Sequence, residues 1–406
     1  MMKYICNTCH KNTCNNKIEL IVDQTTEEVL LTPQSNTMEF SKKTREELIS
    51  ICKEKRIKGY SGKKKEDIIK LITSASVVNT ICNADLVISA PTPHPIVCNE
   101  PIRVASLFAG CGGLDYGFHN NARYTHVFVN DFDAHACATY EKNFNIKTTL
   151  GDIKQIKTIP DCDILLGGFP CQGFSMANPY RSEKDKRNEL YLEILRLLKL
   201  KQPKYFLLEN VKGLLNMGGY ETNEDKKKQT GKILKVILSD LKECGYNVKF
   251  KLFDIKDFDV PQKRQRVIIV GVRSDIHFEP KWPEPSKKII TIKDAIGDLP
   301  IEYNPAIQHI GTKHKCAVTG YLGNRELSWD EPSPTITGRG GGSGGPVIHN
   351  HPSLKRRLTV RECARIQTFP DTFEFAGSIS SMYKQLGNAV PCKFSEYLST
   401  IFETAP

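Results

Sequence analysis

The sequence lacks a long apolar run. A helix that spans a bilayer needs about 20 consecutive apolar residues, and no stretch of the 406 residues approaches that length. We therefore expect a soluble protein that does not bind membranes. No secretory signal precedes the 14 cysteines, which are scattered singly through apolar segments. This pattern favours reduced thiols inside the cell over a set of disulfide bonds.

The sequence has fewer acidic than basic residues. Lys and Arg number 57 against 46 Asp and Glu, which gives a formal net charge of +11. Such an excess favours a polyanionic partner. The length exceeds that of one ordinary domain and predicts two large units with an appendage.

Residues 1–40 offer little chemistry. Cys6, Cys9, His10 and Cys14 have the spacing of half a zinc site and also match the attachment pattern of c-type haem. Haem attachment needs an exported, oxidising context, which we do not expect here. The four side chains could surround a zinc ion only in a cramped loop. We therefore favour a disordered segment without a metal, and a zinc site stays the alternative.

Residues 41–75 predict two short helices. The first begins with a capping-box pattern, Thr44 to Glu47. The net charge between residues 41 and 70 is +6. This helix–gap–helix pattern resembles a SAP module, a small DNA-binding unit, and implies DNA contacts by Lys63 and Lys64. The alternative is a charged hairpin that only caps the rest of the protein.

After a linker predicted over residues 76–100, a glycine-rich turn follows a buried strand. The strand covers residues 104–108, and the glycines of the turn would let a cofactor approach the backbone and the start of a helix. The next strand ends at Asp131, about twenty residues later, where doubly wound folds hold ribose hydroxyls. A third strand ends near Asp152. Such a turn suits several nucleotide cofactors, NAD included, although the G-x-G-x-x-G pattern is absent.

A cysteine motif, Gly168-Phe169-Pro170-Cys171-Gln172, follows a fourth apolar strand. Pro170 fixes its own φ and pushes Phe169 away from helical geometry, so Cys171 is presented on a stiff turn. Two further strands lead to Glu209 and to the basic cluster Gln262–Arg266. A lone cysteine is more often a buried apolar residue, and a Glu–Arg pair is often a surface ion pair. Three such motifs at three strand ends favour a reactive site.

Together these motifs, which run from about Val104 to Pro391, resemble the DNA (cytosine-5) methyltransferase family. The alternation of strands and helices predicts an α/β fold with a doubly wound, mostly parallel sheet, and the resemblance implies a Rossmann-like methyltransferase fold. It divides the chain into a catalytic domain (101–275), a smaller target-recognition domain (276–380) and a C-terminal return to the catalytic domain (381–406).

The resemblance gives each motif a role. Cys171 would attack C6 of a cytosine flipped out of a specific short duplex DNA sequence, while Glu209 donates a proton to N3 and Arg266 binds O2. Arg264 would brace the loop of Cys171 or nearby backbone. The implied methyl donor is S-adenosylmethionine, and its expected contacts are Phe108, Ala109, Gly110, Gly112, Gly113, Leu114, Asp131, Phe132, Asp152, Ile153, Pro170, Leu190 and Asn388. The implied DNA contacts are Gln172, Ser175, Thr335, Thr337 and Arg339.

Two alternatives stay open. A tRNA (cytosine-5) methyltransferase would use the same fold and cysteine chemistry, and a DNA-binding protein with vestigial catalysis would keep the same motifs. The glycine-rich insertion between Val272 and Arg361 favours double-stranded DNA as the partner. We expect a monomer located with the DNA inside the cell, in a prokaryotic cytoplasm, a nucleus or a viral factory. The sequence leaves open whether methylation protects against a companion restriction endonuclease, silences genes or marks a viral genome.

Overall fold

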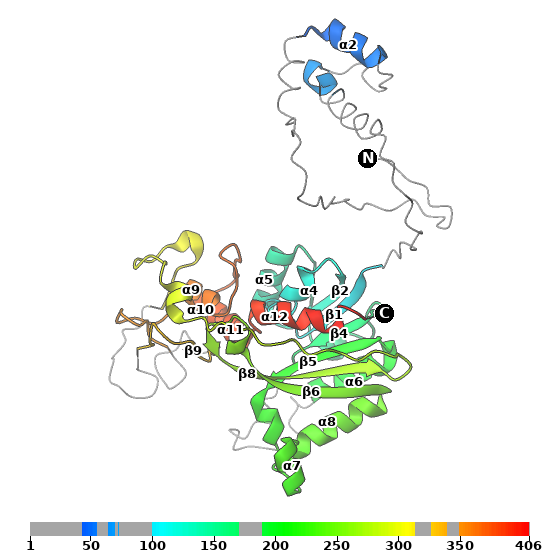
Figure 1. The fold of residues 1–406 in the computed structure, drawn as a ribbon, viewed down its shortest axis with the longest axis vertical. Coiled ribbons are helices and arrows are strands. Elements are labelled where there is room, and N and C mark those ends of the chain that lie inside the picture. The colour runs from blue at the N-terminus through cyan, green and yellow to red at the C-terminus, as the bar shows by residue number, and fades with distance from the viewer. Residues whose placement is uncertain are drawn as a thin grey trace. The chain divides into compact units, whose positions relative to one another are not determined.

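The computed structural model divides the chain into two compact units, residues 1–97 and 98–406 (Figure 1). It describes residues 43–54, 64–69, 72, 100–169, 189–312, 326–338 and 349–405. The cysteines around His10, the residue Lys63 and nearly all of the predicted linker lie outside the described residues. No helix in the described part of the chain is both long and apolar enough to cross a membrane.

The first unit contains helix α2 (Arg45–Glu54) and further helical residues at 65–69 and 72. The Glu47 carboxylate accepts a hydrogen bond from the backbone N–H of Thr44 at 2.6 Å, and the Thr44 hydroxyl accepts one from the N–H of Glu47 at 3.3 Å. The predicted capping box is therefore confirmed. Leu48, Cys52 and Ile68 are fully buried in a small apolar cluster. Two helical stretches are confirmed, and their role in DNA binding stays a prediction.

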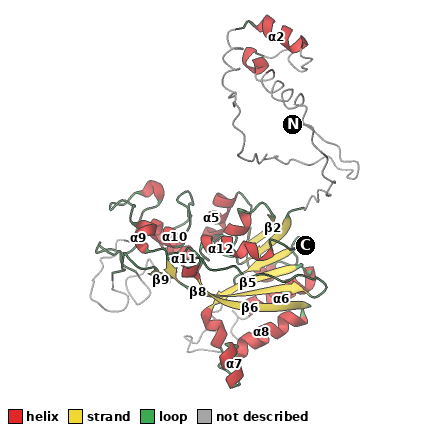
Figure 2. Cartoon of the chain, viewed as in Figure 1, coloured by secondary structure: helices red, strands yellow, loops and turns green. Residues whose placement is uncertain are grey.

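The second unit is built on a seven-stranded sheet with the order β3-β2-β1-β4-β5-β8-β6 (Figure 2). The first five of these strands are mutually parallel, and only β8 runs against its neighbours β5 and β6. The prediction of a mostly parallel sheet is confirmed. The strands are β1 (Ile102–Leu107), β2 (Tyr124–Asp131), β3 (Thr149–Leu150), β4 (Ile164–Gly167), β5 (Tyr205–Val211), β6 (Tyr246–Asp254) and β8 (Gln265–Arg273).

Helices cover both faces of this sheet, which explains why its central strands read as continuous apolar runs. Successive side chains of a strand point to opposite faces. Leu165 packs in one core with α6 (Glu189–Lys201) and α8 (Lys232–Glu243), whereas Leu166 packs in the other with α4 (Tyr116–His119) and α12 (Cys392–Ser399). Short elements connect these layers: η1 (Ile153–Gln155), η2 (Lys212–Asn216), α7 (Asn223–Lys228) and η3 (Ile255–Asp257).

The region after β8 has few strands, as expected, but it has a core of its own. Ile292, Ile336 and Val360 are buried together with Tyr140 and Phe144 of helix α5 (Ala134–Phe144), so this region is packed onto the glycine-turn side of the sheet. Its elements are α9 (Ile292–Ile296), η4 (Pro305–Ile307), β9 (Ser333–Pro334), α10 (Val360–Ile366) and α11 (Ile379–Asn388). β9 pairs with β7 (Gln262–Lys263), which precedes β8, and η5 (Thr400–Phe402) packs in the same core as α12.

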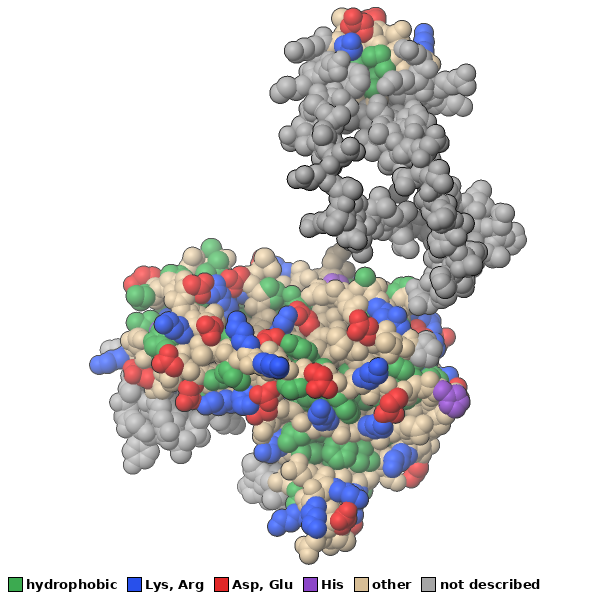
Figure 3. Space-filling model, viewed as in Figure 1, with side chains coloured by type: hydrophobic (Ala, Val, Ile, Leu, Met, Phe, Trp, Pro, Cys, Tyr) green, Lys and Arg blue, Asp and Glu red, His purple; other side chains and the backbone are tan. Residues whose placement is uncertain are grey.

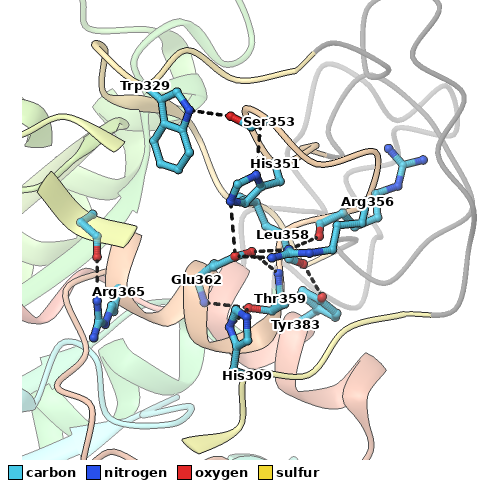
Figure 4. A network of polar contacts seen from close by, with 12 residues as sticks. His309, Trp329, His351, Ser353, Arg356, Leu358, Thr359, Glu362, Arg365 and Tyr383 are labelled. Carbon is cyan, nitrogen blue, oxygen red and sulfur yellow. Dashed lines mark hydrogen bonds and ion pairs between the residues drawn. The ribbon is translucent and has the colours of Figure 1, made fainter. Parts of the chain in front are cut away.

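A buried carboxylate organises the start of α10 (Figure 4). Glu362 is 1% exposed, and its oxygens accept two hydrogen bonds from Arg356, each 2.8 Å, and one from the N–H of Thr359 at 2.7 Å. Burial opposes the ionisation of Glu362, but the hydrogen bonds and charge of Arg356 outweigh it, so its pKa is lowered. His351 lies 3.7 Å from this carboxylate, and His309 lies 3.0 Å from the Thr359 hydroxyl.

Acid should destabilise the second unit. Burial is the main cause that lowers the pKa of both His309 and His351. Below about pH 6.5 the unfolded chain therefore binds more protons than the folded one, and the free energy of unfolding decreases as the pH is lowered. We expect the melting temperature to drop between about pH 7 and 5. His351→Asn, whose amide oxygen can replace Nδ1 as acceptor for the N–H of Ser353, should flatten this dependence. An unchanged slope in that variant would exclude His351 as its source.

Candidate active site

A cavity of about 1050 Å³ lies at the carboxyl ends of the parallel strands. Ligands of doubly wound folds bind at this edge of the sheet. The cavity is lined by the turn after β1, the end of β2, the turn after β4, the end of β5 and the end of α11. Most of the side chains expected to bind a cofactor line it: Phe108, Ala109, Gly110, Gly113, Leu114, Asp131, Phe132, Leu190 and Asn388.

The glycine turn after β1 needs its glycines for two reasons. Gly110 has φ +57° and Gly112 has φ +89°, which is left-handed backbone that favours glycine. At Gly113 a Cβ atom would lie 2.3 Å from the carbonyl oxygen of Val390. Gly112 lies against the ring of Phe144 and is not among the residues that line the cavity. The turn therefore serves both the cavity and the packing of the C-terminal segment.

Asp131, at the end of β2, holds the turn in place. One of its carboxylate oxygens accepts a hydrogen bond from the N–H of Gly110 at 2.8 Å, and the other accepts one from the N–H of Asp133 at 2.9 Å. Burial raises the pKa of Asp131, and these backbone hydrogen bonds oppose the shift. The neighbouring ring of Phe132 is 68% exposed on the cavity wall. An uncovered aromatic ring beside a fixed carboxylate suits a nucleoside.

Two of the expected cofactor contacts lie elsewhere. The Asp152 carboxylate accepts a hydrogen bond from the N–H of Lys154 at 3.0 Å at the start of η1. Ile153 is 2% exposed and packs in the core between the sheet and α6. Neither lines the cavity, so their contact with a cofactor stays a prediction. Pro170 lies outside the described residues.

Glu209 and Arg266 form an ion pair on the cavity wall. Arg266 Nε lies 2.5 Å from Glu209 Oε1, and the two side chains are 12% and 13% exposed. The neighbouring Asn210 is buried and donates a hydrogen bond to the carbonyl oxygen of Phe169 at 3.2 Å. The Glu209 strand is thereby tied to the turn that leads into Cys171. Cys171 itself lies outside the described residues.

Arg264 is fully buried and does not line the cavity. Its guanidinium donates hydrogen bonds to the carbonyl oxygens of Ile336 at 2.9 Å, Gly387 at 3.1 Å and Ala389 at 3.0 Å. Burial, and then the charge of Arg266, hold the pKa of Arg264 well below its usual range. Arg264 therefore braces backbone, and its described partners belong to the C-terminal region.

A second, polar cavity of about 410 Å³ adjoins the first and shares Val211, Gly213 and Arg266 with it. Thr335 lines this cavity and donates a hydrogen bond to the carbonyl oxygen of Lys263 at 2.9 Å. Thr337 follows two residues later and precedes Gly338, which packs against α11. The other expected DNA contacts Gln172, Ser175 and Arg339 lie outside the described residues, and Lys64 is exposed in the first unit.

Sequence reasoning missed two residues of this site. Asp133 and Lys384 both line the large cavity and form an ion pair across it. The position of Asp133 in the sequence is typical of a helix N-cap, which explains its place at the start of α5. It does not predict the ion pair with Lys384. Lys384 carries no signal in the sequence beyond its place in an amphipathic helix. Within the described residues, no group of three or more His, Cys, Asp or Glu side chains could hold a metal ion.

The doubly wound sheet and the cavity at the carboxyl ends of its strands are typical of α/β enzymes that bind nucleotide-like cofactors. The family model for C-5 cytosine-specific DNA methylases matches residues 102–402. The chain therefore belongs to the C-5 cytosine-specific DNA methylase family, and it is a DNA (cytosine-5) methyltransferase. Membership of this family favours DNA as the substrate over tRNA, the substrate of the first alternative.

Curated relatives agree with this family, and solved structures agree with the fold. The Type II methyltransferase M.NgoFVII of Neisseria gonorrhoeae is 40% identical over 329 residues, which cover 72% of this chain and 84% of the relative. M.MthTI of Methanothermobacter thermautotrophicus is 37% identical over 73% of this chain and 95% of the relative. The fold is similar to that of the S. pombe methyltransferase Dnmt2, with a TM-score of 0.57, 21% identity, and coverage of 75% of this chain and 99% of that one.

Removal of the Arg264 side chain should destabilise the second unit. In Arg264→Met the three carbonyl oxygens lose their donor, and a buried unsatisfied polar group costs about 1–3 kcal/mol. We expect a melting temperature lower by at least several degrees. Lys263→Met is the matched control, because its ion pair with Glu331 is 49% and 63% exposed and such pairs contribute about 1 kcal/mol or less. Equal melting temperatures for the two variants would show that Arg264 does not hold the region together.

Proposed function

We propose that this enzyme transfers a methyl group from S-adenosylmethionine to C5 of a cytosine flipped out of duplex DNA, with Cys171 as the nucleophile. The observation that carries the proposal is the Glu209–Arg266 ion pair on the wall of the same cavity that Asp131 and Phe132 line. One cavity thus brings groups for a nucleoside cofactor beside groups for a polar base. Asn210, next to Glu209, donates a hydrogen bond to the carbonyl oxygen of Phe169, in the turn that precedes Cys171.

Three residues that line the cavity suit S-adenosylmethionine. Asp131 offers a carboxylate whose orientation two backbone N–H groups fix, and it can accept hydrogen bonds from ribose hydroxyls. Phe132 offers an exposed ring for the adenine, and Asn388, exposed at the end of α11, offers an amide. When bound, S-adenosylmethionine supplies an electrophilic methyl group for C5.

The remaining groups activate the base. The ring of cytosine is a poor nucleophile, and addition of the Cys171 thiolate to C6 turns it into an enamine with electron density at C5. Glu209 can donate a proton to N3 and hold the exocyclic amine, and Arg266 can bind O2 and stabilise the charge that develops there. After methylation, a water molecule takes the C5 proton, the C6–S bond breaks with its electron pair leaving on the Cys171 thiolate, and N3 returns its proton to Glu209, which restores the aromatic ring.

The partner follows from this chemistry. C5 and C6 are stacked inside a duplex, so the target nucleotide must swing out at a cost of a few kcal/mol.

We assign recognition of the flanking bases to residues 276–380, with Thr335, Thr337 and Arg339, and contacts beside the flipped base to Gln172 and Ser175. Figure 3 shows Lys and Arg interspersed with Asp and Glu among the described residues on one face of the second unit. The Type II names of the relatives favour protection against a companion restriction endonuclease.

Cys171→Ser should abolish methylation, because a hydroxyl does not form the C6 adduct at neutral pH. Binding of S-adenosylmethionine and of a duplex should stay nearly unchanged.

Glu209→Gln should lower turnover by more than tenfold and DNA affinity far less, because its contact with N3 matters mainly in the transition state. Methyl transfer to duplex DNA and to total tRNA, measured side by side, checks both variants and the substrate class. Substantial turnover by Cys171→Ser would refute the covalent mechanism.

Exchange of residues 276–358 for the matching segment of a relative with another recognition sequence should transfer the sequence preference. Base edges are read in the grooves, separately from the chemistry on the flipped base. Bisulfite sequencing of DNA from a methylation-free host that expresses the chimera would reveal the methylated site. Methylation of the original sequence by a folded, active chimera would place recognition elsewhere.

Deletion of residues 1–95 should weaken duplex binding and flatten its salt dependence, because the +6 segment at residues 41–70 contacts phosphates, which add affinity without reading sequence. Processive methylation of long DNA should fall, while the methylated sequence and turnover on a short saturating duplex stay the same. Variants with Lys63 and Lys64 changed to Gln test the same contacts within the full chain. A truncated protein with an unchanged salt slope and processivity would exclude this tether.

A further inference from the structure

An ion pair crosses the large cavity between two segments that are far apart in the sequence. Lys384, one turn before the end of α11, places its Nζ 2.7 Å from Asp133 Oδ2, between β2 and α5. The same Nζ lies 5.8 Å from the centroid of the Phe132 ring. All three residues line the cavity.

The pair extends a chain of hydrogen bonds along the cavity wall. Asp131 joins the N–H of Gly110 to the N–H of Asp133, and the Asp133 side chain then reaches Lys384. Asp133 uses its two oxygens for separate purposes. Oδ1 accepts hydrogen bonds from the N–H groups of His135 and Ala136 at the start of α5, and Oδ2 faces Lys384. Two carboxylates thus link the glycine turn, α5 and α11.

The other side of this end of α11 contacts the segment expected to read DNA. A Cβ atom on Gly387 would lie 1.9 Å from the backbone nitrogen of Gly338, so the two backbones are in direct contact. A Cβ atom on Gly338 would lie 3.5 Å from the side-chain oxygen of Asn388. The position of α11 therefore sets both one wall of the cavity and the placement of residues 337–338.

Folding stability alone does not account for the pair. The side chains of Lys384 and Asp133 are 52% and 19% exposed, and ion pairs with this exposure contribute little to stability. Burial opposes the ionisation of Asp133, but the hydrogen bond from Lys384 and those from the α5 amides outweigh it and lower its pKa. The Asp133 carboxylate therefore stays charged at neutral pH, beside an aromatic ring that is 68% exposed.

We propose that Lys384 is a positioning residue for the cofactor, and that with Asp133 it forms a clasp that fixes the separation between Phe132 at the end of β2 and Asn388 at the end of α11. The inference rests on the proposed function, which places S-adenosylmethionine between these two residues. The clasp holds the walls of the cavity together before the cofactor binds, so less order has to be gained on binding. Its loss should weaken binding of the cofactor and of the demethylated product alike.

Two variants break the clasp and keep the rest of the structure. Lys384→Met removes the charge and keeps an unbranched side chain, and Asp133→Asn keeps Oδ1 as the cap of α5 and loses the charge that faces Lys384. In the full chain at low salt, each should raise the Kd of S-adenosylmethionine and of S-adenosylhomocysteine about threefold, the size that an ion pair of this exposure supports. The loss should appear in the KM for the cofactor rather than in kcat. The double variant should bind no more weakly than either single one.

Lys142→Met is the matched control. Lys142 pairs with Glu374 and likewise joins α5 to the C-terminal region, through side chains 54% and 53% exposed that do not line the cavity. It should leave both dissociation constants unchanged, and Lys384→Arg should restore them. Unchanged binding in Lys384→Met and Asp133→Asn, additive losses in the double variant, or an equal loss in Lys142→Met would each overturn the clasp. A wild-type protein that binds neither compound would instead refute the proposed function.

Discussion

The second unit depends on one buried guanidinium. A charge taken fully out of water is costly unless hydrogen bonds satisfy it, and among the described residues Arg264 donates such bonds to the carbonyl oxygens of Ile336, Gly387 and Ala389. Arg264 precedes β8, Ile336 lies between the two threonines expected to contact DNA, and the other two residues flank Asn388. The constraint therefore fixes three segments relative to one another: the start of β8, the segment around Ile336, and the end of α11 with Asn388.

The direction of one strand completes the site. Parallel strands bring their carboxyl ends to one edge of the sheet, and β1, β2, β4 and β5, with the turns after them, line the cavity there. β8 is antiparallel to β5, so its amino end reaches the same edge, and Arg266 pairs with Val211 in register. For this reason Arg266 lies beside Glu209 although it begins its strand. The same strand running parallel would place Arg266 at the opposite edge of the sheet.

The C-terminal segment completes the wall of the cavity, most of which comes from the first half of the second unit. α11 returns to the glycine turn, where Gly113 leaves room for the carbonyl oxygen of Val390. Lys384 reaches Asp133 from the same helix. The end of α11 thus lies between the cavity and the segment with Gly338, whose backbone is in direct contact with that of Gly387.

The sequence by itself determined what depends on near neighbours: the α/β alternation, the capping box at Thr44, the glycine turn, and Asp131 and Glu209 at strand ends. Such patterns involve residues a few positions apart, and local chemistry decides them. Only the tertiary structure decided the antiparallel course of β8, the partners of Arg264, up to 125 residues away, and the contact of Lys384 with Asp133, 251 residues away. It also placed the Asp152 side chain at the start of η1, away from the cavity. These outcomes depend on how distant segments pack, and neither the spacing nor the type of residues along the chain records that.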